Sequence, residues 1–116
     1  MNETTPEHLQ SQMRKGLLEY CILLIIARGK VYASEIISEL KIAQVLVVEG
    51  TLYPMLSRLK SAGYLEYTWA ESTSGPPRKY YTLTAAGQKN LALLHHIWKN
   101  LTSSVDHLAE PYEKNQ

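Results

Sequence analysis

The sequence predicts a mostly helical α+β fold in a single domain, and three observations carry this prediction. The chain has 116 residues, the usual size of one domain. Hydrophobic residues make up 45% and charged residues 20% of it, as in ordinary globular proteins. Apolar residues recur at helical spacing in four segments, and between the third and the fourth lies a region that alternates around a turn.

The first helix is expected from Pro6 to about Arg28, with Thr5 as its cap and Gly29 at its end. Residues 17–27 of this helix are apolar almost all round, which is wider than the single stripe of a surface helix. Because so short a chain has few elements to cover such a helix, we expect a second subunit to cover part of it.

Two further helices are expected in the middle of the chain. One spans residues 33–41, and the β-branched residues 42–48 behind it are expected to form a brief strand. The other begins at Glu49 to Thr51 and ends at Gly63, with Pro54 tolerated near its start.

A hairpin is expected next, because residues 64–69 and 78–83 alternate and residues 72–77 are rich in turn formers. Trp69 is expected in the core of this hairpin.

The last helix is expected from its cap Thr84 to about Ala109, since Pro111 should prevent its extension. Its apolar residues are spaced alternately three and four apart, as in a seam that pairs with another helix. They are Leu91, Leu94, Trp98, Leu101, Val105 and Leu108.

Composition also bounds the location and the partners. A lone cysteine, Cys21, and the absence of a convincing signal peptide predict a cytoplasmic protein. The apolar run of residues 21–27 is too short to span a membrane. The net charge of +1 divides into +4 over residues 14–89, −2 before them and −1 after them. A basic centre permits contact with a polyanion.

Three helices followed by a hairpin is the order of a winged helix-turn-helix domain, whose third helix enters the major groove of DNA. On that helix Thr51, Pro54 and Arg58 share one face. They offer a hydroxyl, an apolar contact for a thymine methyl and a guanidinium that can bind guanine. Arg78 and Lys79 leave the hairpin tip and are expected to bind phosphates.

Each of these features has a simpler explanation. Arg58 could lie on a solvated helix face, and Arg78 and Lys79 could protect a strand edge from aggregation. Trp98 either packs in the seam or contacts a ligand. The histidines His95, His96 and His107 have no cysteine or carboxylate cluster beside them, so no metal is predicted. Without a phosphate-binding glycine loop or a nucleophile motif, neither catalysis nor a cofactor is expected.

Several motifs resemble the PadR family of bacterial transcriptional regulators. They are Glu49-Gly50-Thr51-Leu52-Tyr53-Pro54 with Arg58-Leu59, Gly63-Tyr64-Leu65, Trp69, Gly75-Pro76-Pro77-Arg78-Lys79-Tyr80-Tyr81, and Leu83-Thr84 with Gly87. The resemblance implies a winged-helix DNA-binding domain, a homodimer joined through the first and last helices, and repression relieved by a small molecule. The short final helix is similar to that of multidrug-responsive members, in which a tryptophan like Trp98 lines a channel between subunits.

Together the residues and the resemblance predict a winged helix-turn-helix fold with a long C-terminal dimerisation helix. Residues 1–88 form the DNA-binding part and residues 84–110 the dimerisation helix of one compact domain. The expected DNA-binding residues are Tyr32, Ser34, Thr51, Tyr53, Pro54, Arg58, Arg78 and Lys79. The expected dimer contacts are Leu17, Cys21, Leu24, Leu91, Leu94, Trp98, Leu101, Val105 and Leu108.

The predicted function is a ligand-responsive repressor that binds an inverted-repeat operator in double-stranded DNA as a homodimer. A planar aromatic molecule is the inducer expected at Trp98, and no membrane is involved. The alternative is a winged-helix module that binds a protein partner without specific DNA binding.

Overall fold

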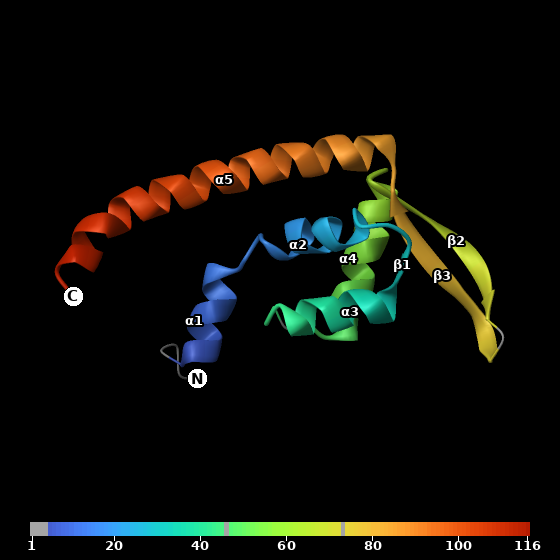
Figure 1. The fold of residues 1–116 in the computed structure, drawn as a ribbon. Helices are drawn as coiled ribbons and strands as arrows, with labels where there is room; N and C mark the ends of the chain where they lie inside the picture. The colour runs from blue at the N-terminus through green and yellow to red at the C-terminus, as the bar shows by residue number, and fades with distance from the viewer. Residues whose placement is uncertain (1–4, 46, 73) are drawn as a thin grey trace.

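The computed structural model describes residues 5–45, 47–72 and 74–116, and confirms a mostly helical winged-helix fold (Figure 1). Three helices, α2, α3 and α4, pack beside a small antiparallel sheet of order β1-β3-β2, and α5 runs along one side. In chain order the elements are α1 (Pro6–Met13), α2 (Leu18–Ile26), β1 (Val31–Tyr32), α3 (Ala33–Ile42), α4 (Glu49–Ser61), β2 (Leu65–Ser72), β3 (Gly75–Leu83) and α5 (Ala85–Lys114).

The N-terminal region is two helices, so the prediction of one continuous helix to Arg28 was wrong. Thr5 caps α1 as expected, because its hydroxyl accepts from the backbone N–H of His8 at 3.2 Å. A turn over residues 14–17 then separates α1 from α2. Gly16 adopts a φ of +88° there, in the left-handed region that glycine enters at little cost.

Helix α2 is the centre of the core, and its own chain covers most of it. Five of its nine residues are buried, between α3, α4, α5 and the sheet. The expectation that its apolar surface needs a second subunit was therefore wrong for most of this helix. Only Leu24 is a large exposed hydrophobic residue of α2, at 38%.

The strand expected over residues 42–48 is not found in its described residues, because Ile42 is the last residue of α3 and residues 43–45 and 47–48 form no strand. The chain turns instead at Gln44, where φ is 64°, and the N–H of Val45 bonds the carbonyl of Leu40 at 2.7 Å. The strand that the sequence analysis missed is β1, whose Val31 and Tyr32 pair with Tyr81 and Tyr80 of β3. A β-branched run stays out of a sheet when no strand edge lies beside it.

Strands β2 and β3 form the expected hairpin, which reaches well beyond the helices (Figure 1). Leu65 at its base is buried, whereas Trp69 is 62% exposed although it lies on the same side of the strand. The prediction that Trp69 lies in a core was therefore wrong. Alternation identifies a face of the hairpin but does not say how far the body beneath it extends.

Helix α5 begins at its cap Thr84, whose hydroxyl accepts from the N–H of Gly87 at 2.9 Å. It continues to Lys114, so the expectation that Pro111 ends it near Ala109 was wrong. Proline removes one hydrogen bond and disturbs the preceding turn, and on an exposed last stretch of a long helix this is tolerated. No helix among the described residues is long and apolar enough to cross a membrane.

Candidate nucleic-acid interface

Helix α4 presents a narrow exposed ridge between two grooves. Leu52, Leu56 and Leu59 face the core and are buried, as predicted. At about 100° per residue, Pro54 and Ser57 lie on the opposite side of the helix. Both are exposed. In Figure 1 this helix stands between α1 on one side and the β2–β3 hairpin on the other.

The groove on the hairpin side has a volume of about 500 Å³ and joins three elements. It brings together five of the eight predicted DNA-binding residues, from the start of α3, from α4 and from the hairpin. These five are Tyr32, Ser34, Tyr53, Arg78 and Lys79. Ser57 and Trp69 also line it and were not among the predicted residues. Alternation of residue types along the hairpin does not show that Trp69 is exposed, so the sequence did not identify it as a groove residue.

Aromatic rings hold the two basic side chains of the hairpin. The Tyr32 and Tyr80 rings stack with centroids 4.0 Å apart, and their hydroxyls are hydrogen-bonded. The Arg78 guanidinium lies 5.0 Å from the Tyr32 ring centroid. The Lys79 ammonium lies 4.5 Å from the ring centroid of Tyr67 and 5.3 Å from that of Trp69. Such contacts restrict the cations without neutralising them.

The stacked pair also changes the acidity of a phenol. The hydrogen bond with Tyr32, with smaller contributions from burial and neighbouring charges, raises the pKa of Tyr80 above its ordinary value. A phenol of ordinary pKa is already neutral at physiological pH, so Tyr80 adds no negative charge beside Arg78 and Lys79.

The start of α3 is fixed against this groove. The Glu35 carboxylate accepts a hydrogen bond from the backbone N–H of Tyr32 at 2.9 Å, which satisfies a donor at the helix start. The same tyrosine pairs with β3, so α3 and the hairpin are held in one arrangement.

The groove on the other side of α4 has a volume of about 940 Å³ and lies against α1 and the following turn. Thr51 and Arg58 line it, so the structure separates them from the hairpin residues. Arg58 is 64% exposed and forms an ion pair with Glu19 of α2 at 3.3 Å. Arg14 and Lys15 line the same groove and were not among the predicted site residues. Pro54 lies on the ridge and lines neither groove.

Comparison with known proteins identifies the family. The model of the transcriptional regulator PadR-like family matches residues 22–93, which is more than half of the chain. The chain belongs to this family. It is accordingly a PadR-like transcriptional regulator and not an enzyme, as the sequence predicts.

Solved PadR-like structures share its fold. A PadR-like transcription factor from Bacteroides fragilis is 55% identical, with a TM-score of 0.73, over 87% of this chain and 98% of that one. A PadR-like regulator from Bacillus cereus is 38% identical, with a TM-score of 0.76, over 84% and 96%. Bacillus subtilis PadR, solved in complex with operator DNA, is 27% identical, with a TM-score of 0.61, over 72% of this chain and 46% of that one.

Outside the two grooves, the PadR-like chain carries a long apolar surface on α5. The first half of the predicted seam is used within the chain, since Leu91 and Leu94 pack against the core, as does Cys21 of α2. The second half is open, with Leu101 at 53%, Val105 at 59% and Leu108 at 77% exposure.

A third groove, of about 620 Å³, lies between α1 and α5. Its apolar lining joins the open half of the seam to the first helix. These residues are Pro6, Leu9, Met13, Leu17, Trp98, Leu101 and Val105. Leu24 lies apart from them, beside Leu91 and His95.

Trp98 is half-buried at the inner end of this third groove. Its ring centroid lies 6.3 Å from that of Tyr20, whose hydroxyl is 2.6 Å from Nδ1 of His95. Burial, with a smaller contribution from Cys21, raises the pKa of the Tyr20 phenol. The indole thus lies beside the Tyr20 ring, tilted by 47° to it, and also lines the groove. Among the described residues, no three metal-binding side chains come together.

Proposed function

We propose that this PadR-like regulator binds operator DNA sequence-specifically through α4 and the hairpin, and represses transcription as a homodimer. The observation that carries the proposal is the exposed ridge of α4 beside a groove in which Arg78 and Lys79 are held by aromatic rings. A helix of this width fits the major groove, where side chains read base edges. The solved complex of Bacillus subtilis PadR with operator DNA supports this use of the fold.

The roles divide by position. Thr51, Pro54 and Arg58 lie nearest the bases and read them, and Arg58 exchanges the Glu19 carboxylate for guanine. Arg78 and Lys79 bind phosphates. The other three predicted residues, Tyr32, Ser34 and Tyr53, line the groove between these two sets and position the DNA backbone.

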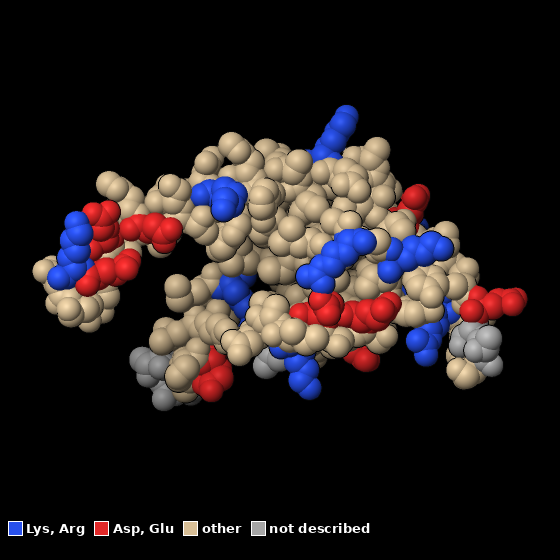
Figure 2. Space-filling model, viewed as in Figure 1, with Lys and Arg blue, Asp and Glu red and all other residues tan. Residues whose placement is uncertain are grey.

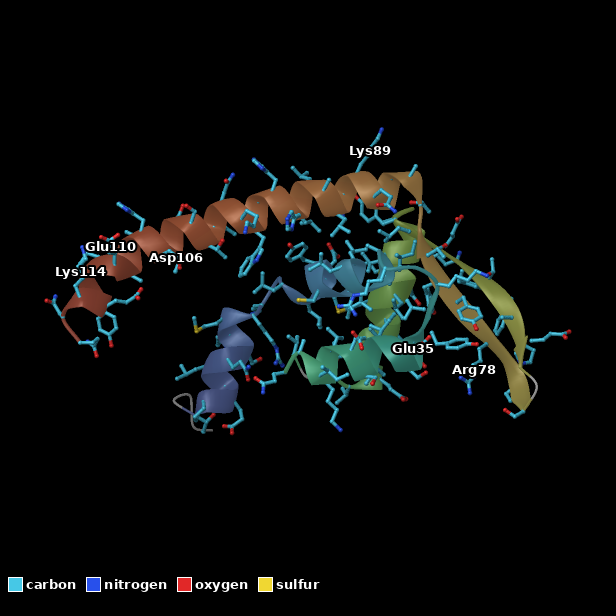
Figure 3. All side chains as sticks on the ribbon, in the orientation of Figure 1. Glu35, Arg78, Lys89, Asp106, Glu110 and Lys114 are labelled. Atoms are coloured by element: carbon cyan, nitrogen blue, oxygen red, sulfur yellow. The ribbon has the colours of Figure 1, made fainter. Side chains whose placement is uncertain are left out.

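The distribution of charge along the chain supports DNA as the partner, since residues 14–89 carry a net charge of +4. Figure 2 shows basic and acidic side chains interspersed on the half of the molecule that carries α3 and the hairpin, and mostly acidic side chains at the C-terminal end of α5. Asp106 and Glu110 mark that acidic end in Figure 3, far from Arg78. A regulator of this kind acts where the bacterial chromosome lies, in the cytoplasm.

The shape of the chain supports a homodimer. Its radius of gyration is 17.0 Å, whereas a compact domain of this length has roughly 13 Å. Both α5 and the β2–β3 hairpin extend past the helical body, and α5 leaves its apolar side uncovered (Figure 1). A second copy that covers this side with its own α1 and α5 would bury the predicted seam and set two α4 helices about one DNA turn apart. Such a dimer requires an operator with inverted-repeat symmetry.

We further propose that a planar aromatic molecule binds at Trp98 and lowers DNA affinity. The half-buried indole at the end of an apolar groove supports this proposal, because a second aromatic ring can stack on it. If Trp98 instead only packs in the dimer, planar aromatic dyes will change neither its fluorescence nor the binding of DNA.

The test of DNA binding is a mobility shift with the duplex upstream of the protein's own gene, against a scrambled duplex. Arg58→Ala is expected to cost about 1 to 3 kcal/mol on the specific site and to relax its sequence preference. Lys79→Ala is expected to weaken binding to both duplexes and to lower the salt slope by about one unit.

The contrast between the two variants is the control, because Arg58→Ala is expected to change the sequence preference, whereas Lys79→Ala is expected to weaken binding to both duplexes alike. If the wild type shifts both duplexes equally and neither substitution matters, sequence-specific binding is contradicted and a protein partner for the hairpin is favoured.

A further inference from the structure

Basic side chains lie on both sides of α4, and the hairpin supplies them on only one side. Arg14 and Lys15, at the end of α1, line the groove that also holds Thr51 and Arg58 of α4. Arg78 and Lys79 line the opposite groove, with Tyr53 and Ser57. The two pairs therefore lie in grooves on opposite sides of the exposed ridge of α4, and Figure 1 shows α1 and the hairpin on either side of this helix.

We infer that the turn between α1 and α2 is a second phosphate-binding site, in which Lys15 and Arg14 hold the DNA strand that the hairpin does not reach. The inference rests on the proposed DNA binding. A helix of about 10 to 12 Å diameter fills a major groove of about 12 Å, so a phosphate backbone runs along each side of it. The hairpin serves one backbone and the turn serves the other.

The charges around this turn favour an anion. The lining of the groove contains three cations, Arg14, Lys15 and Arg58, and one acid, Glu19. Glu19 pairs with Arg58 in the free protein, and cations still outnumber the acid in this lining when Arg58 turns to a base. Neither Arg14 nor Lys15 forms an ion pair within the described parts of the chain. The hydroxyls of Ser11 and Thr51 add two donors to the same groove.

The backbone of the turn explains why these cations line the groove beside α4. Gly16, at φ +88°, lies in the turn where the chain changes direction between the two helices, and the N–H of Leu17 bonds the carbonyl of Arg14 at 2.9 Å. This tight turn places the last residues of α1 beside the N-terminal half of α4. Had α1 and α2 been one straight helix, residues 14 and 15 would have continued along its axis.

Arg14 and Lys15 are not equivalent. Arg14 also lines the third groove, between α1 and α5, so it borders the proposed dimer surface. Lys15 is exposed and lines only the groove beside α4. Lys15→Gln therefore tests the phosphate contact without touching the dimer surface, and Arg14→Gln is read together with the mass of the variant in solution.

The experiment measures the affinity for a random-sequence duplex of about 30 base pairs by fluorescence anisotropy over a salt titration. Lys15→Gln is expected to lower the salt slope by about one unit for each bound protomer, and the double variant with Arg14→Gln by about two. The hairpin variant Arg78→Gln with Lys79→Gln should show a similar decrease of about two. A matched control removes two charges from α5, at Lys89, which points away from the body in Figure 3, and Lys99, and should leave the slope unchanged.

A second variant guards against loss of folding. Glu19→Gln removes the one acid of this groove, and should raise the affinity and steepen the slope by up to about one unit. Damage to the fold would change the affinity in the opposite direction.

The outcomes separate the two proposals. A decrease for the hairpin variant with no change for Lys15→Gln, the double variant or Glu19→Gln overturns the second phosphate site and leaves DNA binding intact. A wild type that binds no duplex even at low salt overturns both.

Discussion

Single residues fix the joint between the hairpin and α5. The hydroxyl of Thr84 donates to the carbonyl of Gly63 at 2.6 Å and accepts from the N–H of Gly87. Gly87 is buried, and a Cβ on it would lie 2.0 Å from the backbone oxygen of Tyr64. Position 87 therefore requires glycine, because the backbone of α5 approaches the backbone at Tyr64 too closely for a Cβ.

Gly87→Ala is therefore expected to destabilise the protein by about 1 to 3 kcal/mol, because the backbone at Tyr64 must move. Urea unfolding followed by circular dichroism measures the change. The control is Gly50→Ala, where nothing lies within 4 Å and the helix accepts alanine, so stability should stay level or rise. Equal stability of the two variants would contradict the close packing of α5 on Tyr64.

One thiol and two phenols are expected to make the stability of the fold decrease at alkaline pH. Burial raises the pKa of the Cys21 thiol above its ordinary 9.0, and burial is the largest cause that raises the pKa of the Tyr20 and Tyr81 phenols above 10.0. The folded state holds these protons more tightly than the unfolded state. Their stabilising contribution is thus complete below pH 9 and is lost as the pH rises through the folded values.

The free energy of unfolding of the wild type should decrease from pH 8 to pH 11. The free energy of unfolding of Tyr81→Phe should decrease less over the same range. Tyr112→Phe, at an exposed position of α5, is the matched control and should follow the wild type. A Tyr81→Phe profile parallel to that of the wild type would show that this phenol does not contribute.

At the scale of elements, sequence patterns predicted the helices and the hairpin but not where each meets its neighbour. The inward leucines of α4 and the cap of α5 followed from periodicity and capping chemistry. The break before Leu18 depended on one glycine within a helical pattern. The exposure of Trp69 depended on the length of the hairpin relative to the body, which no local pattern contains.

The same limit applies to the candidate site. Five of the eight DNA-binding candidates meet in one groove, and their role in DNA binding stays a prediction. Arg58 was placed on the face of Thr51 and Pro54 by spacing alone, and its pairing with Glu19 required knowledge of how α2 packs on α4. Arg14 and Lys15 were not predicted as site residues, because the sequence pattern places them within one continuous helix.

Trp69 is expected to matter for DNA binding because it helps to hold Lys79. The Lys79 ammonium lies near its ring, and the Trp69 ring meets that of Tyr67 edge-on, with centroids 6.1 Å apart. Trp69→Ala should weaken binding by about 0.5 to 1 kcal/mol, the value of one exposed cation–π contact. Anisotropy with the upstream duplex measures it, and Leu93→Ala, on the exposed side of α5, is a control for loss of surface area. Unchanged affinity would mean that Tyr67 alone holds Lys79.

At the scale of the whole molecule, the chain is elongated, with extents of 58 × 35 × 22 Å, as the proposed homodimer requires of each protomer. The uncovered side of α5 and the apolar side of α1 are continuous through the third groove. An interface that covers both would bury about 2,000 Å² or more, as obligate dimers do.

Light scattering at micromolar concentration should accordingly report about twice the 13.2 kDa of one chain. Leu101→Asp with Val105→Asp should shift the mass toward the monomer, since two charges would be buried in the seam. Ser103→Asp with Ser104→Asp adds the same charge at exposed neighbouring positions and should shift the mass toward the monomer less. A wild type that stays monomeric would contradict the dimer and the paired half-sites.

The most direct measurement of DNA recognition is a binding selection, in which the wild-type protein enriches duplexes from a random library that is then sequenced. Two α4 helices related by a twofold axis predict one enriched motif with inverted-repeat symmetry and half-site centres about 10 base pairs, one helical turn, apart. An asymmetric motif would contradict the twofold arrangement, and a library left without enrichment after repeated rounds would contradict sequence-specific DNA binding itself.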